Sequence, residues 1–224
     1  MYLRKSSKAL THREVRDISE AVHFAEKIGK PLTATLNINP ALLADYPANM
    51  CLWVSAFLNK LRIWCDRTGF GYFAIWVREN YEGDRREHLH VFLSVPEQQR
   101  KELEEAARRW LPGDPAVLEV GRPKFSNDGF GRRVNKALTY LLKQMTPQAW
   151  ASLGRAVRRE KHCRRTGEPV APIMGKRCGV SRSLSEKTRR IFWANPASAL
   201  DKIPATEKAW CSATIWMRTQ RQTG

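Results

Sequence analysis

The spacing of apolar residues predicts four helices in the first two thirds of the chain. Thr11-His-Arg-Glu14 has the form of an N-terminal capping box, and an apolar stripe at helical intervals follows it until Gly29. The other three expected helices are Leu52–Trp64, Pro96–Trp110 and Arg133–Met145.

Between these helices the apolar residues alternate with a period of two, which is typical of strands. In Leu32–Ile38 the even positions are apolar and the odd positions Thr33, Thr35 and Asn37 are polar. This strand is therefore expected to have one covered face and one open face. The remaining expected strands are Tyr72–Glu79 and Leu89–Val95, which a polar loop joins into a hairpin, and the short Ala116–Val120.

The order of these elements, α-β-α-β-β-α-β-α, indicates an α+β fold with a central antiparallel sheet of four strands and flanking helices. The composition changes beyond about residue 150, since residues 155–190 hold 12 Lys and Arg but only 3 Asp and Glu. We therefore expect a folded domain over residues 1–150 and a basic, mainly helical region over residues 151–224.

The net charge of the chain indicates the kind of partner that it binds. The chain has 39 Lys and Arg against 22 Asp and Glu, a formal net charge of +17, which favours a polyanion such as nucleic acid. The longest apolar run, Cys51–Leu58, is far shorter than the roughly 20 residues of a membrane-spanning helix, so no membrane partner is expected. The basic start of the chain has no apolar core for export, which favours a cytoplasmic protein.

The five cysteines are scattered and form no Cys-x-x-Cys pair, so they indicate reduced thiols and no disulfide framework or zinc ribbon. His162, Cys163 and Cys178 could belong to a metal site, but their spacing matches no zinc finger.

His88 and His90 are the first candidates for chemistry. Leu89, Val91 and the next odd positions are all apolar, so the two imidazoles are expected to project together from the other face of their strand. Two imidazoles on one face can bind the same metal ion. The alternative is a structural histidine pair without a ligand.

Tyr140 is the second candidate. On the expected helix 133–145 it lies opposite the apolar arc, with Lys136 and Lys143 beside it. Two ammonium groups favour negative charge nearby, either on the phenol or on a phosphate. The alternative is an ordinary polar helix face that carries Tyr and Lys.

Together these segments resemble the HUH endonuclease family of Rep-like rolling-circle initiators, relaxases and single-strand transposases. The resemblance rests on His88-Leu-His90, on Tyr140-Leu-Leu-Lys143 as a Tyr-x-x-Lys motif, and on Leu32–Ile38 as the family's first-strand motif. It implies a Rep-like palm fold and metal-dependent nicking of single-stranded DNA by Tyr140, with a 5′-phosphotyrosine intermediate and Lys143 steadying the phosphate. The metal would be Mn²⁺ or Mg²⁺ on His88 and His90.

The resemblance also implies an acidic third ligand, and Arg78-Glu79 matches the family's Arg-Glu pair ahead of the histidines. Strand alternation places Glu79 with Ile75 and Val77, so we expect it to reach the histidine face only if the strand twists or bulges at its end. The other candidates for this ligand are Glu82, Asp84 and Glu87.

The favoured function is initiation of rolling-circle replication of a plasmid or phage at an origin or hairpin, with a host helicase and polymerase because the sequence has no Walker A motif. One alternative is a transposase or mobilisation relaxase with the same chemistry. Another is a DNA-binding or RNA-binding regulator without catalysis, in which the histidines are structural.

Several polar residues are expected to contact DNA. They comprise the odd positions of the first strand and basic residues of the last two segments: Thr33, Thr35, Asn37, Lys136, Lys176, Arg177 and Arg182. Residues 174–184 contain a Gly-Val-Ser-Arg step similar to that of a helix-turn-helix, although a basic loop is the favoured interpretation.

Overall fold

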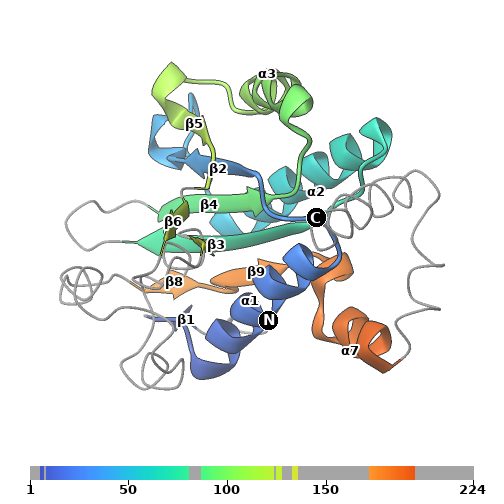
Figure 1. The fold of residues 1–224 in the computed structure, drawn as a ribbon. Coiled ribbons are helices and arrows are strands. Elements are labelled where there is room, and N and C mark those ends of the chain that lie inside the picture. Colours follow the sequence, from blue (N-terminus) through green and yellow to red (C-terminus); the bar gives the residue numbers. More distant parts are fainter. Residues whose placement is uncertain are drawn as a thin grey trace.

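The computed structural model describes residues 6–7, 9–80, 87–123, 125–127, 133–135 and 172–194. Figure 1 shows a central sheet with helices packed on it. The strands of this sheet are β2 (Ala34–Ile38), β3 (Ala74–Asn80), β4 (Glu87–Leu93), β5 (Leu118–Gly121) and β9 (Cys178–Val180). Their order is β5-β2-β4-β3-β9 and every neighbouring pair is antiparallel, which confirms the expected α+β class.

The described helices are close to those that the sequence predicts. Their bounds are α1 (His12–Lys27), α2 (Met50–Thr68), α3 (Arg100–Trp110) and α7 (Glu186–Ala194). The capping box of α1 is confirmed, because Glu14 N–H donates to Thr11 Oγ1 at 3.3 Å and Thr11 N–H donates to Glu14 Oε2 at 2.8 Å. Gly69, with φ of 83°, ends α2 in the left-handed conformation that glycine adopts most easily.

Short elements connect these helices and strands. The 3-10 turns are η1 (Pro40–Leu42), η2 (Glu97–Gln99), η3 (Pro115–Val117) and η5 (Arg182–Leu184). Two small antiparallel pairs lie outside the main sheet, namely β1 (Ser6–Ser7) with β8 (Ile173–Met174), and β6 (Phe125–Asn127) with β7 (Arg133–Asn135). None of the helices that the described residues form is long and apolar enough to cross a membrane.

Two apolar cores lie on the two faces of the sheet. On one face α1 and α7 cover Phe73, Ile75, Val77 and Phe92. On the other face α2 and α3 cover the odd positions of β4 and the even positions of β2. The expectation of one open face is therefore wrong, because α1 and α7 cover part of the face that carries the histidines.

The fifth strand, β9, corrects the sequence analysis. It pairs with β3 through Cys178↔Val77 and Val180↔Ile75, so a segment of the expected C-terminal region belongs to the main sheet. Residues 174–184 consequently form no helix-turn-helix, since they hold a strand followed by the turn η5. Three residues make a strand too short for alternation to reveal.

The expected helix over residues 133–145 is also corrected at its start. Arg133–Asn135 form β7, which pairs with β6. The rest of the expected helix, with Lys136, Tyr140 and Lys143, lies outside the described residues.

The described cysteines are Cys51, Cys65 and Cys178, and none of these three forms a disulfide bond. Burial raises the pKa of Cys65 to about 12, and the neighbouring Asp66 carboxylate acts in the same direction. Burial also raises the pKa of Cys178. Both groups are therefore neutral, packed thiols at physiological pH.

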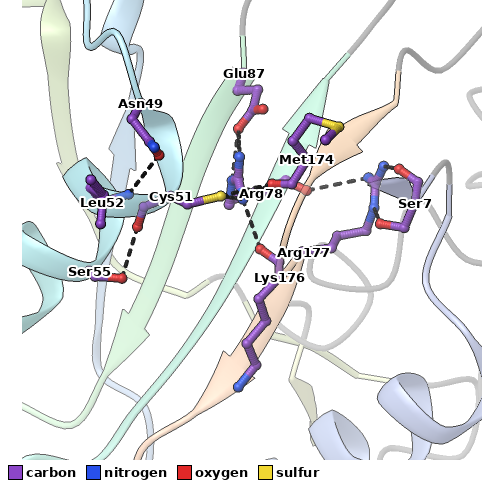
Figure 2. A network of polar contacts seen from close by, with 10 residues as sticks. All are labelled: Ser7, Asn49, Cys51, Leu52, Ser55, Arg78, Glu87, Met174, Lys176 and Arg177. Atoms are coloured by element: carbon purple, nitrogen blue, oxygen red, sulfur yellow. Dashed lines mark hydrogen bonds and ion pairs between the residues drawn. The ribbon is translucent and has the colours of Figure 1, made fainter. Parts of the chain in front are cut away.

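Two buried arginines attach the segment around β8 and β9 to the sheet, as Figure 2 shows. Arg78 is 1% exposed, donates from Nε to Glu87 Oε2 at 2.7 Å, and donates from Nη1 to the carbonyls of Met174 at 3.0 Å and Lys176 at 2.9 Å. Arg177 is also 1% exposed and donates to the carbonyl of Ser7 at 2.6 Å. Removal from water lowers the pKa of Arg177 from its ordinary value.

We expect Glu87→Ala to destabilise the protein by about 3–5 kcal/mol, because it leaves the buried Arg78 guanidinium without its counter-charge. Urea denaturation measures the effect. The matched control is Glu186→Ala, which removes the carboxylate of an exposed pair with Arg190 and should cost less than about 1 kcal/mol. Equal losses for the two variants would contradict the structural role of the Arg78–Glu87 pair.

Candidate active site

A row of polar side chains crosses four neighbouring strands of the sheet. Asn37 on β2 lies opposite Glu119 on β5 and His90 on β4. Asn37 Nδ2 donates to Glu119 Oε2 at 3.3 Å, and Asn37 Oδ1 lies 2.9 Å from His90 Nδ1. On the far side of the imidazole, His90 Nε2 lies 3.2 Å from Glu79 Oε2 on β3. We call these four residues the polar row.

The position of Glu79 corrects the expectation that a bulge is needed. Residues directly opposite each other in an antiparallel pair share a face of the sheet. Glu79 lies opposite His88 and Val77 lies opposite His90, so Glu79 reaches the histidine face in regular register. The expectation failed because it assigned the apolar and the histidine positions to different faces, whereas they follow one another along the same face.

The hydrogen bonds of Asn37 determine which nitrogen of His90 carries a proton. Because Asn37 Nδ2 donates to Glu119, its Oδ1 faces His90 and accepts from Nδ1–H. Nε2 is then the nitrogen that faces the Glu79 carboxylate. His90 is 5% exposed and Glu79 is 3% exposed, so little water separates these two groups from each other. The arrangement places one imidazole nitrogen in contact with one carboxylate oxygen inside the protein.

His88 lies beside this pair and is half-buried. Its ring is nearly parallel to that of His90, with an interplanar angle of 10° and centroids 6.4 Å apart. Two imidazoles that bind one ion through bonds of about 2.1 Å need their ligating nitrogens about 3 Å apart. A shared ion therefore requires the His88 ring to turn toward His90.

The donor set fits a divalent cation in part. Within the described ranges, no group of three or more His, Cys, Asp or Glu side chains is arranged to hold a metal ion. Glu79 Oε2 and His90 Nε2, at 3.2 Å, have the separation expected of neighbouring ligands in an octahedral site. Both oxygen and imidazole nitrogen are ligands that Mn²⁺ accepts.

The alternative third ligands differ in position. Glu87 lies on the opposite face of β4 from His88 and is paired with the buried Arg78, so it is unsuitable as a ligand. Glu82 and Asp84 lie outside the described residues.

The expected DNA contacts divide into structural and exposed residues. Thr33 Oγ1 donates to the carbonyl of Val95 at 2.5 Å and accepts from its N–H at 2.8 Å, so it joins two segments of the chain. Thr35 is buried, and Arg177 is buried with its guanidinium hydrogen bonded to Ser7. Thr33 and Arg177 therefore have structural hydrogen bonds and Thr35 is buried, while a DNA contact by any of them stays a prediction. Lys176 and Arg182 are exposed, as expected of DNA contacts.

The sequence analysis missed the role of two residues in the polar row. Asn37 was expected to contact DNA, but it bonds to His90, and Glu119 was not singled out. Glu119 is the one acidic residue of the expected strand 116–120, and this feature of the sequence could have identified it as a candidate site residue. Its pairing with Asn37 depends on the register between β2 and β5, which alternation does not reveal.

Comparisons with protein-family models, with curated proteins and with solved structures found no match for this chain.

We expect His90→Ala to destabilise the protein by about 2–3 kcal/mol in EDTA, because it leaves the buried Glu79 carboxylate and the Asn37 amide without this imidazole. His88→Ala should cost less than about 1 kcal/mol, since the side chain is half-buried. Urea denaturation of both variants provides the comparison. A larger loss for His88→Ala would contradict the polar row.

Proposed function

We propose that this chain is a metal-dependent, site-specific single-stranded DNA endonuclease and strand transferase of the HUH type. The observation that carries the proposal is the convergence of Glu79 Oε2 and His90 Nε2 at 3.2 Å, with His88 on the same face of the sheet. A buried carboxylate beside an oriented imidazole is a common arrangement in metal sites of enzymes.

Glu79, His90 and, after rotation of its ring, His88 would hold the cation. When bound, Mn²⁺ or Mg²⁺ supplies a positive charge that polarises a non-bridging oxygen of the scissile phosphate. Asn37 holds His90 Nδ1–H, which keeps Nε2 directed at the ion. Glu119 in turn holds the amide of Asn37 in the required orientation.

Tyr140 and Lys143, which lie outside the described residues, complete the proposed chemistry. The Tyr140 phenol gives up its proton to solvent as its oxygen attacks phosphorus in line. The bond from phosphorus to the 3′ oxygen breaks, and this oxygen takes up a proton from solvent to leave as a 3′-OH. The products are a 5′-phosphotyrosine and a free 3′ end. Lys143 offsets the negative charge of the phosphate or of the phenolate.

The covalent link retains the energy of the phosphodiester bond, so a 3′-OH can later reverse the reaction and join two ends. This property suits replication initiation of a plasmid or phage in the cytoplasm better than degradation of DNA. A host helicase and polymerase would then extend the free 3′ end. A transposase or mobilisation relaxase would use the same chemistry at a different DNA site.

The second candidate is a nucleic-acid-binding regulator without catalysis. It is favoured by the hydrogen bonds within the polar row, because Asn37 and Glu79 contact the two ring nitrogens of His90. In such a protein the row would only stabilise the sheet.

We expect Tyr140→Phe to abolish a covalent protein–DNA adduct while binding of single-stranded DNA is largely retained, because only the attacking oxygen is removed. The assay incubates the protein with a pooled single-stranded DNA library and Mn²⁺, followed by a denaturing protein gel with and without EDTA. Tyr46→Phe is the matched control, since Tyr46 is exposed and distant in sequence from the motif, and it should form the adduct normally. An adduct that survives in Tyr140→Phe or in EDTA would favour another nucleophile or a metal-free reaction.

We expect Asn37→Leu to lower Mn²⁺ affinity by about 10–100-fold, because His90 loses the acceptor that orients it. Electron paramagnetic resonance of free Mn²⁺ measures this without DNA or turnover. The matched control is Asn39→Leu, which removes the same kind of side chain from the start of η1, outside the polar row. If wild-type protein and both variants bind Mn²⁺ equally, or if none of them binds it, the metal role of the polar row fails.

A further inference from the structure

A groove of about 800 Å³ lies at the β9 edge of the sheet, between α2, η5 and α7. Aromatic side chains line it, and arginine and hydroxyl side chains reach it from α2 and η5. These side chains include Trp76, Arg62, Asp66 and Arg182. We call it the Trp76 groove. The residues that line the groove include none of the four residues of the polar row, so the groove is separate from it.

The Trp76 ring packs directly against the backbone of Gly179 on the neighbouring strand, because Gly179 has no side chain. The two residues lie opposite each other in the β3–β9 pair. A Cβ atom built on Gly179 would come within 2.8 Å of Trp76 Nε1 and 2.9 Å of Cε2 and Cζ2. Trp76 remains partly exposed in the groove. The result is a fixed indole surface of the kind on which an unpaired base can stack.

Positive charge lies next to this indole. Lys176 Nζ lies over the Trp76 ring, 5.8 Å from its centroid, so a base that stacks on this face would move the ammonium aside, toward a flanking phosphate. Both Lys176 and Arg182 are exposed. The Arg62 guanidinium is paired with Asp66 at 2.8 Å, so these two charges balance. Lys176 and Arg182 therefore give the Trp76 groove a net positive rim, which complements a phosphate backbone.

We propose that the Trp76 groove binds single-stranded DNA, with one unpaired base stacked on Trp76 and flanking phosphates on Lys176 and Arg182. The inference rests on the proposed function for the identity of the strand, and it adds a binding site distinct from the site of cleavage. A base in a closed duplex cannot stack on a protein side chain without leaving its neighbours. The groove therefore selects unpaired DNA.

The first experiment measures binding of a fluorescent single-stranded oligonucleotide to Tyr140→Phe protein in EDTA, so neither nicking nor metal is needed. Lys176→Glu/Arg182→Glu should weaken binding at least about tenfold and reduce the salt slope by about 1.4, which is about 0.7 for each lost phosphate contact on a single strand. The matched control is Lys101→Glu/Arg109→Glu, which makes the same charge change on exposed residues of α3 and should have a smaller effect. Equal losses would overturn the proposal, because they would show only a general charge effect.

The second experiment changes the indole without changing charge. Gly179→Ala displaces Trp76 from its place on β9 and should weaken single-stranded binding about tenfold, while binding to the matching duplex stays the same. Urea denaturation of each variant confirms that it folds. Unchanged single-stranded binding by a folded Gly179→Ala protein with a displaced indole would overturn the proposal.

The third experiment is oxidative footprinting of Trp76 in the otherwise unchanged full chain. Trp76 should become protected when the oligonucleotide is added. Protection already complete without DNA would overturn the proposal, because this chain or a second copy would then fill the groove. These binding results do not depend on the adduct assay, so a failure of cleavage and a failure of this site are distinguishable.

Discussion

The register of β3 against β4 determines both the packing and the candidate chemistry of this protein. Arg78 and Glu79 are adjacent on β3, and Glu87 and His88 are adjacent on β4. Because neighbouring residues of a strand point to opposite faces, one face receives the Arg78–Glu87 ion pair and the other receives Glu79 with the histidines. A slip of one residue would exchange the faces and bury each charged group beside the wrong partner.

The two faces treat their buried charges differently. On the α2 face, Arg78 is hydrogen bonded to a carboxylate and to backbone carbonyls, an arrangement that compensates for its removal from water. On the histidine face, Glu79 Oε2 lies 3.2 Å from His90 Nε2, and both groups are buried. The first pair is suited to holding β8 and β9 on the sheet. The second pair contains two groups that could both be metal ligands, which is why the proposed function is centred on it.

Much of the fold could be predicted from the sequence, because α1, α2 and the β3–β4 hairpin have long, regular apolar patterns. The strand β9 could not, since a pattern of three residues carries no period. The polar row was predictable only in its parts. The sequence indicates His88, His90 and Glu79, but the link from Asn37 to Glu119 depends on contacts between strands that lie 82 residues apart in the chain. The faces of β3 were misassigned because one face of a strand can be apolar under a helix and polar beyond its end.

The net charge of +17 overestimates the positive charge that the surface can offer to a nucleic acid, because some of the arginines are buried or paired. Arg177 lies inside the protein, and Arg189 on α7 is paired with Asp17 at 2.7 Å and Glu20 at 3.0 Å on α1. These arginines belong to the most basic stretch of the chain, yet they hold its described part against the folded core. The charge available to a polyanion is therefore the remainder, such as Lys176 and Arg182. In the proposed groove, its position at Trp76 would supply a specificity for unpaired bases that net charge cannot supply.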